Sequence, residues 1–421
     1  MEAFAQLTVF LILIILLARA AILLSNRFGL PSISFQLLIG ILIGPSLLNL
    51  LEVPIVIGTW GSTPASLLHS ILKILAEIGL IQLLFLAGLR IDWHELKADL
   101  KPIFSLSLWG FILTAMVVAI VVQGFVERWT EGVAIAAIMA TGSLGISVYH
   151  FNETGLLKSR TTNMVLGSAI LTGLLAILLM IAVQAMNYAS NYGSLKMTIA
   201  VSWFVAKLIM FFAIAYFLAS RFLRLITRTG FQKRPLQAFI GYLLLVAAIY
   251  AWGAMHFGSF AAVGIASLGG GLLGISSSGL KEKITGGPGS ALAALPVGIL
   301  FVVLGMEVNI RSIEGHFIFL AVVLACIVGT KLMGGWMATR KGFESSRERA
   351  LIMFGALHQG EIGMLIAAYL FSRGLVDPSQ FNLSIILVIM LTILAPILMK
   401  VAAVKFNVQS TSVRVSELRN R

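Results

Sequence analysis

The chain has 421 residues, of which 59% are hydrophobic and 11% are charged, and its mean hydropathy is +1.00. This composition is typical of a polytopic membrane protein and excludes an ordinary soluble domain. The formal net charge of +13 would suit nucleic acid, but the basic residues are spaced between apolar runs, so we expect no nucleic-acid partner. The single cysteine, Cys326, excludes an internal disulfide framework.

Apolar runs close to the ~20 residues needed to cross a bilayer recur along the chain and predict about thirteen transmembrane helices. The predicted spans are 5–25, 33–51, 67–89, 102–126, 132–151, 161–187, 196–219, 236–255, 259–277, 291–309, 316–338, 348–372 and 382–405. The first run follows neither a basic region nor a cleavage site, so we expect a helix and not a removed signal. The prediction is an all-α membrane domain over 1–405 and a short polar tail over 406–421.

The loops between the spans differ sharply in their basic residues. Alternate loops hold most of the lysine and arginine, including the cluster within 221–234, whereas the opposite loops hold only Arg128, Lys196, Arg311 and Arg373. Cytoplasmic loops carry the excess of basic residues, so the N-terminus is predicted outside and the C-terminus in the cytoplasm. The basic loop 221–234 also separates two halves of similar hydropathy, which predicts inverted repeats.

Glycine and polar residues interrupt two of the spans. The segment 141–145, Thr-Gly-Ser-Leu-Gly, breaks the fifth span, and 356–363, Ala-Leu-His-Gln-Gly-Glu-Ile-Gly, breaks the twelfth. Unwound backbone at membrane depth is tolerated where it lines a site or is buried in protein. Transporters with inverted repeats place two such helices across the substrate site. Close packing of small residues explains the fifth span equally well when it is considered alone.

Charged residues inside the spans need a partner or a function. The acids are Glu77, Glu307 and Glu361. Lys73 and Glu77 lie four residues apart on one helix face, which predicts an ion pair. His358 precedes Glu361 by three residues, so the two are predicted either to relay protons or to tie the broken helix to a neighbour.

The chain resembles the second family of bacterial monovalent cation:proton antiporters over nearly its whole length. The resemblance rests on Leu30-Pro31-Ser32 with the run 36–46, on the segments 75–80 and 84–89, on the stretch 131–186, and on 360–363, Gly-Glu-Ile-Gly. It implies that the two broken helices cross and that the protein forms homodimers in a bacterial inner membrane or an equivalent membrane. It further implies a moving core bundle around 132–187 and 316–372 on a scaffold of the remaining helices.

The chain departs from the family at one position. The family's paired acids, usually Asn-Asp or Asp-Asp, fall where this sequence has Thr172-Gly173. Lys331, in the middle of its span, matches the membrane-embedded lysine that faces those acids in the family. Without them, this lysine must find another acid, lose its proton or meet an anionic ligand.

These observations give three functional hypotheses. The resemblance implies a secondary transporter that exchanges Na⁺ or K⁺ for protons. The missing acids and the retained lysine favour transport of a small anion, bicarbonate or chloride, on the same fold. A transport-inactive regulatory paralogue is the third. Candidate ion-binding residues are Thr141, Ser143, Ser168, Thr172, Lys331 and Glu361, with His358 and Glu361 as the proton relay. We expect no enzyme, no cofactor and no resident metal, because the histidines lack ligand spacing. The expected partners are the transported ion, the proton, membrane lipid and a second copy of the chain.

Overall fold

The computed structural model describes residues 2–28, 32–44, 46–49, 65–90, 99–156, 159–192, 194–228, 235–257, 268–273, 288–340, 343 and 346–405. Regular structure in these ranges is entirely helical, as expected in hydrocarbon, where each backbone amide needs a partner within its own segment. The helices coincide with every predicted span except 259–277, most of which lies outside the described residues. The tail 406–421 lies outside them as well.

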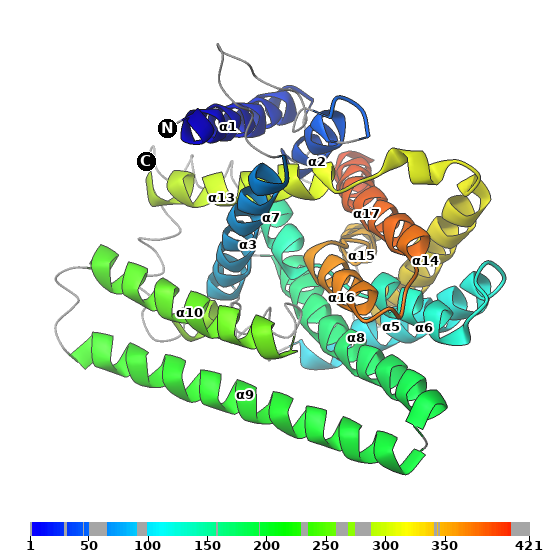
Figure 1. Cartoon of the computed structure of the whole chain (residues 1–421). Helices are drawn as coiled ribbons and strands as arrows, with labels where there is room; N and C mark the ends of the chain where they lie inside the picture. Colours follow the sequence, from blue (N-terminus) through cyan, green and yellow to red (C-terminus); the bar gives the residue numbers. More distant parts are fainter. Residues whose placement is uncertain are drawn as a thin grey trace. The chain divides into compact units, whose positions relative to one another are not determined.

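In chain order the helices are α1 (Glu2–Phe28), α2 (Ser32–Ile43), α3 (Ala65–Arg90), α5 (Leu100–Val122), α6 (Trp129–Met139), α7 (Leu144–Glu153), α8 (Arg160–Tyr192), α9 (Ser194–Arg228), α10 (Pro235–Phe257), α13 (Pro288–Met306), the 3₁₀ turn η2 (Ile310–Ile313), α14 (Phe317–Thr339), α15 (Ser346–Gly355), α16 (Glu361–Ser372) and α17 (Pro378–Lys405) (Figure 1). Within the described part, eight segments are long and apolar enough to cross a membrane, and four apolar helices are shorter. The all-α membrane fold is therefore confirmed.

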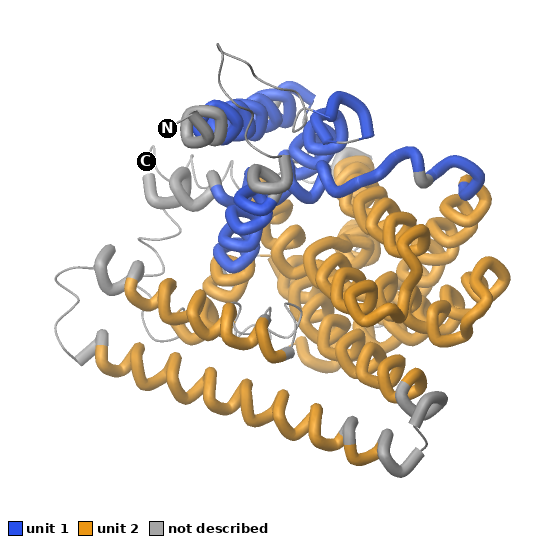
Figure 2. The backbone as a smooth tube through the Cα atoms, viewed as in Figure 1, with its two compact units in different colours: residues 1–83, 282–316 blue, residues 84–281, 317–421 orange. Residues whose placement is uncertain are grey.

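The chain divides into two compact units, and the division falls within α3 (Figure 2). Unit 1 comprises Met1–Leu83 and Glu282–His316, and unit 2 comprises Leu84–Lys281 and Phe317–Arg421. Both broken helices belong to unit 2. Each unit is described by itself below.

Glycines bring the helices of unit 1 into backbone contact. A Cβ atom on Gly40 of α2 would lie 2.1 Å from the Val302 carbonyl oxygen of α13, and one on Gly305 would lie 2.3 Å from the Leu37 oxygen. Such distances leave room for hydrogen alone, so α2 and α13 pack as a small-residue pair of the kind common in membranes.

The predicted Lys73–Glu77 ion pair in unit 1 is wrong. Lys73 Nζ instead lies 3.1 Å from Glu307 Oε1, directly after α13. The reason is the close approach of α3 to α13, where a Cβ atom on Gly79 would lie 2.2 Å from the Pro296 oxygen. Spacing along one helix favoured Glu77, but packing between helices placed a different carboxylate beside the ammonium.

Unit 2 is built around the broken helix α6–α7. In the stretch Trp129–Glu153, 89% of the residues are buried. In Ser202–Leu225 of α9, only 17% of the residues are buried. α6 packs on α5, α8, α16 and α17, and α7 packs on α8 and α16. α9 contacts α8 and α10 instead, which places it at the periphery of the unit (Figure 1).

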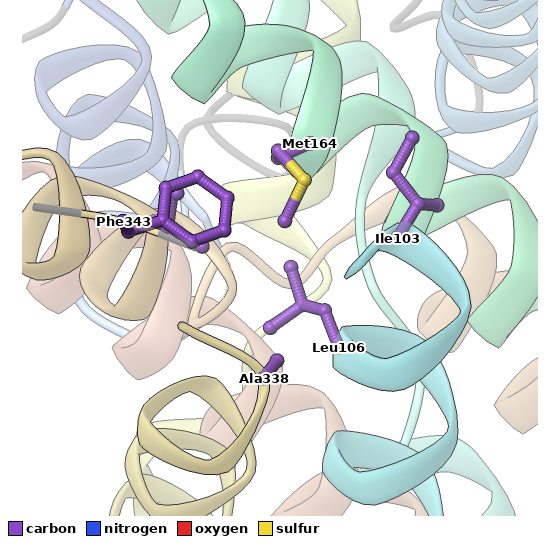
Figure 3. Packing of buried hydrophobic residues seen from close by; sticks show 6 residues of the cluster. Ile103, Leu106, Met164, Ala338 and Phe343 are labelled. Carbon is purple, nitrogen blue, oxygen red and sulfur yellow. The ribbon is translucent and has the colours of Figure 1, made fainter. Parts of the chain in front are cut away.

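An apolar cluster packs together the helices that surround the break (Figure 3). It joins side chains of α5, α8, α14 and α15 with Phe343, and its members are Ile103, Leu106, Met164, Ala338, Phe343 and Ile352. All are at most 7% exposed. This packing gives the polar residues beside it a fixed frame.

Candidate functional site

The two predicted interruptions are confirmed as breaks between half-helices. α6 ends at Met139 and α7 begins at Leu144, while α15 ends at Gly355 and α16 begins at Glu361. The breaks touch one another within unit 2. Ser143 N donates a hydrogen bond to the His358 oxygen (3.1 Å), and Gln359 Nε2 donates to the Ile138 oxygen (2.8 Å). The unwound backbone therefore satisfies its hydrogen bonds across the crossing, as membrane burial requires.

Glycine permits the close approach of the two breaks. A Cβ atom on Gly363 would lie 2.9 Å from Thr141 Oγ1 and 3.3 Å from the Ile138 oxygen. A Cβ atom on Gly142 would lie 2.9 Å from Thr172 Oγ1 and 3.0 Å from the Ala169 Cα atom. Gly363 thus allows tight contact between the two breaks, and Gly142 allows tight contact between the first break and α8.

Lys331 and Glu361 form hydrogen bonds at the buried ends of the half-helices α6 and α7. The last carbonyls of a helix carry partial negative charge, and Lys331 Nζ donates to the Thr141 oxygen just beyond α6 (2.6 Å). The first amides of a helix carry partial positive charge, and Glu361 accepts from Gly145 N in α7 (2.7 Å). Its other oxygen accepts from Ser143 Oγ (2.5 Å). Each buried charge therefore lies at the helix end of opposite sign.

A cavity lies beside the crossing, lined from α5, both helix breaks, α7, α8, α14 and α15. Its polar lining consists of hydroxyls from Thr141, Ser143, Ser147, Ser168 and Thr172, together with Lys331 and His358. No carboxylate belongs to this lining among the described residues. The cavity thus presents one ammonium, one imidazole and several neutral oxygens.

Thr172 binds the unwound segment to α8. Its hydroxyl accepts from Gly142 N (3.1 Å) and is positioned to donate to the Ser168 oxygen one turn earlier (2.9 Å). Thr172 and Lys331 line the same cavity. The resemblance implied that Lys331 faces position 172. Within the described part, no acid lies in salt-bridge range of the Lys331 side chain, so no described carboxylate pairs with it.

Glu361 does not itself line the cavity, but it accepts a hydrogen bond from Ser143, which does. Ser143 and Gly145, at the start of α7, donate to its oxygens, an arrangement suited to a carboxylate that ties two helices together. His358 does line the cavity, and its Nδ1 bonds to the Gly355 oxygen (2.8 Å). Among described residues, no hydrogen bond joins the side chains of His358 and Glu361, so their predicted relay lacks a direct contact.

Three polar residues of this region escaped the sequence predictions: Ser147, His150 and Gln359. Ser147 donates to the Ser143 oxygen one turn earlier (2.6 Å) and lines the cavity. His150 lies 3% exposed on α7, and Gln359 is fully buried at the crossing. The spacing of Ser143, Ser147 and His150 along one helix face was available in the sequence as a signal.

Two broken helices that cross beside a polar cavity define a secondary transporter fold. The sequence model of the family described as "Sodium/hydrogen exchanger, transmembrane" matches residues 12–405. The chain belongs to this family, which confirms the resemblance.

Similar proteins agree with this assignment. The chain is 27% identical to the "Na(+)/H(+)-K(+) antiporter GerN" of Bacillus cereus, over 92% of this chain and 94% of that protein. It is 22% identical to the "Na(+)/H(+) antiporter" of Enterococcus hirae, over 90% and 93% of the two chains. The structure of the sodium proton antiporter MjNhaP1 from Methanocaldococcus jannaschii has the same fold, with a TM-score of 0.67 and 18% identity, covering 97% of this chain and 100% of that one.

Proposed function

We propose that this protein is a secondary transporter that exchanges Na⁺ or K⁺ for protons by alternating access at the cavity beside the crossing. The observation that carries this proposal is the pair of half-helix ends, held by Lys331 and Glu361 around a cavity lined with hydroxyls. The family is one of exchangers, and the similar proteins named above are cation/proton antiporters, which supports transport rather than catalysis.

In this proposal the transported cation is held by neutral oxygens. Alkali cations take oxygen ligands in transport proteins. The hydroxyls of Ser168 and Thr172, which α8 contributes to the cavity lining, are the candidates. The buried ammonium of Lys331 opposes a cation in the same cavity. Cation entry therefore requires Lys331 to release its proton or to move, which links ion binding to proton release.

Purified protein in liposomes loaded with a pH-sensitive dye tests the proposal. Addition of Na⁺ or K⁺ to the outside is expected to move protons outward through liposomes with protein and not through empty ones. Lys331→Met should abolish the exchange because it removes the only ammonium of the described cavity lining. Lys207→Met is the matched control, since Lys207 stands over the Trp203 ring on the exposed face of α9. If no cation gradient moves protons and no anion gradient drives flux, the inactive paralogue replaces the antiporter.

Transport of a small anion is the second candidate, favoured by one observation. The described cavity lining holds Lys331 and no carboxylate, so its fixed charge suits bicarbonate or chloride. Gradients of these anions, imposed one at a time on the same liposomes, distinguish the two functions. Anion flux without cation-dependent proton movement would replace the first proposal by the second.

We further propose a homodimer in the membrane, with the N-terminus outside and the C-terminus in the cytoplasm. The basic loops support the orientation, and the family resemblance supports the dimer and the division into the core bundle around 132–187 and 316–372 and a scaffold. Measuring the mass of the protein in lipid nanodiscs tests the dimer. A monomeric mass in both lipid and gentle detergent would contradict it. Labelling of single cysteines placed in alternate loops tests the orientation.

A further inference from the structure

We propose that His150 and His358 form a proton-binding pair at the helix crossing. The pair rests on the proposed exchange function, since it would supply a proton site in a cavity whose described lining has no carboxylate. His150 belongs to α7 and His358 to the break between α15 and α16. A proton bound here would therefore bridge the two broken helices.

Geometry brings the two imidazoles together. Their ring centroids are 5.1 Å apart, with the ring planes tilted by 48°. This separation permits a nitrogen-to-nitrogen hydrogen bond of about 3 Å when the rings turn their nitrogens toward one another. The Phe151 ring contacts both imidazoles at centroid distances of 5.9 and 6.0 Å. The pair is thus enclosed by an aromatic wall, with His150 3% and His358 1% exposed.

Each ring has one buried nitrogen without a hydrogen-bond partner among the described residues, His150 Nδ1 and His358 Nε2. The tautomer of His358 follows from its other nitrogen. Nδ1 faces the Gly355 oxygen at 2.8 Å and must donate to it, so Nε2 carries the lone pair. Buried polar atoms without a partner are uncommon and call for an explanation. Two of them on adjacent rings are explained together by a proton shared between them.

The charges around the pair come from two helices. Lys331 of α14 lines the cavity with His358, and Glu361 of α16 follows the break. Glu361 is already bonded to Ser143 and Gly145. The residues that α5 and α8 contribute to the cavity lining are uncharged. From α17, the neutral Thr392 donates a hydrogen bond to the Gln359 oxygen. Among these groups, the two imidazoles are the ones that keep a nitrogen without a hydrogen-bond partner among the described residues.

Proton binding to the pair needs no other reactant. A proton from solvent adds to the lone pair of His358 Nε2, and the new N–H donates to the lone pair of His150 Nδ1. Release returns the same proton to solvent, so only one N–H bond forms and breaks. Sharing the proton lets one positive charge be buried with an acceptor already in place. Because both rings take part, they titrate as one coupled unit.

Nitrogen-15 NMR of the full-length protein, labelled at histidine and held in nanodiscs, tests the pair without requiring transport. In the wild type we expect the two signals to titrate together, with a coupling across the N–H···N bond. His150→Gln should move the titration midpoint of His358 by at least about one pH unit, and His358→Gln should do the same for His150. His256→Gln, on an exposed ring, should move neither.

Each outcome decides the inference. Independent titration of the two rings in the wild type, or an unchanged midpoint in both single variants, overturns it. The wild-type spectrum suffices if the variants do not fold. In liposomes, either variant should lose the pH dependence of exchange, whereas His256→Gln retains it. Coupled titration in a wild type that moves no cation would keep the pair and refute antiport. Antiport in a wild type with uncoupled rings would refute the pair alone.

Discussion

Replacement of Glu361 by glutamine separates the two roles considered for this residue, proton carrier and helix anchor. The carboxylate accepts from Ser143 Oγ at 2.5 Å and from Gly145 N at 2.7 Å. Hydrogen bonds to charged groups contribute about 1.5–3 kcal/mol each, against about 0.5–1.5 kcal/mol for neutral ones. For an ionised Glu361, two such bonds therefore weaken by about 2–3 kcal/mol in total when the charge is removed. The lost interaction with the α7 dipole adds about 0.3–1 kcal/mol.

We therefore expect Glu361→Gln to lower the free energy of unfolding by about 2–4 kcal/mol. Denaturant titration of the protein in mixed micelles measures this change. Glu314→Gln is the matched control, because Glu314 is exposed and should leave stability unchanged. Exchange should persist in the folded fraction of the Glu361 variant. Wild-type stability combined with complete loss of proton-coupled exchange would refute the anchoring role and make Glu361 the proton carrier.

Two further substitutions test the placement of the site. Thr172→Asp sets a carboxylate in the cavity that holds Lys331, so it should create or strengthen Na⁺/H⁺ exchange and weaken any anion flux in liposomes. A folded variant with neither change would show that position 172 is not the family's acid position. Gly142→Ala forces a methyl to 2.9 Å from Thr172 Oγ1 and should cost about 1–3 kcal/mol of stability in the same unfolding assay. Gly329→Ala, with nothing within 4 Å, should cost no stability, and equal effects of the two would contradict the tight contact between the break and α8.

The helices and their breaks follow from the sequence because the bilayer restricts what a chain can do. A long apolar run in hydrocarbon must satisfy its amides within itself, so its length predicts a helix. Glycine and hydroxyl residues in the middle of such a run signal the exceptions. The segments 141–145 and 356–363 were recognised in this way, and the half-helix ends at Met139, Leu144, Gly355 and Glu361 agree with them.

The partners of the buried charges were decided only by tertiary structure. Spacing along one helix favoured Glu77 for Lys73, and it left Glu361 either to relay protons with His358 or to tie the broken helix to a neighbour. In the folded chain Lys73 meets Glu307, and Glu361 meets the start of α7. Lys331 donates to a carbonyl 190 positions earlier in the chain. These contacts depend on which helices cross and at what depth. Glycine contacts and apolar packing between distant segments set that geometry, and no single stretch of sequence contains it.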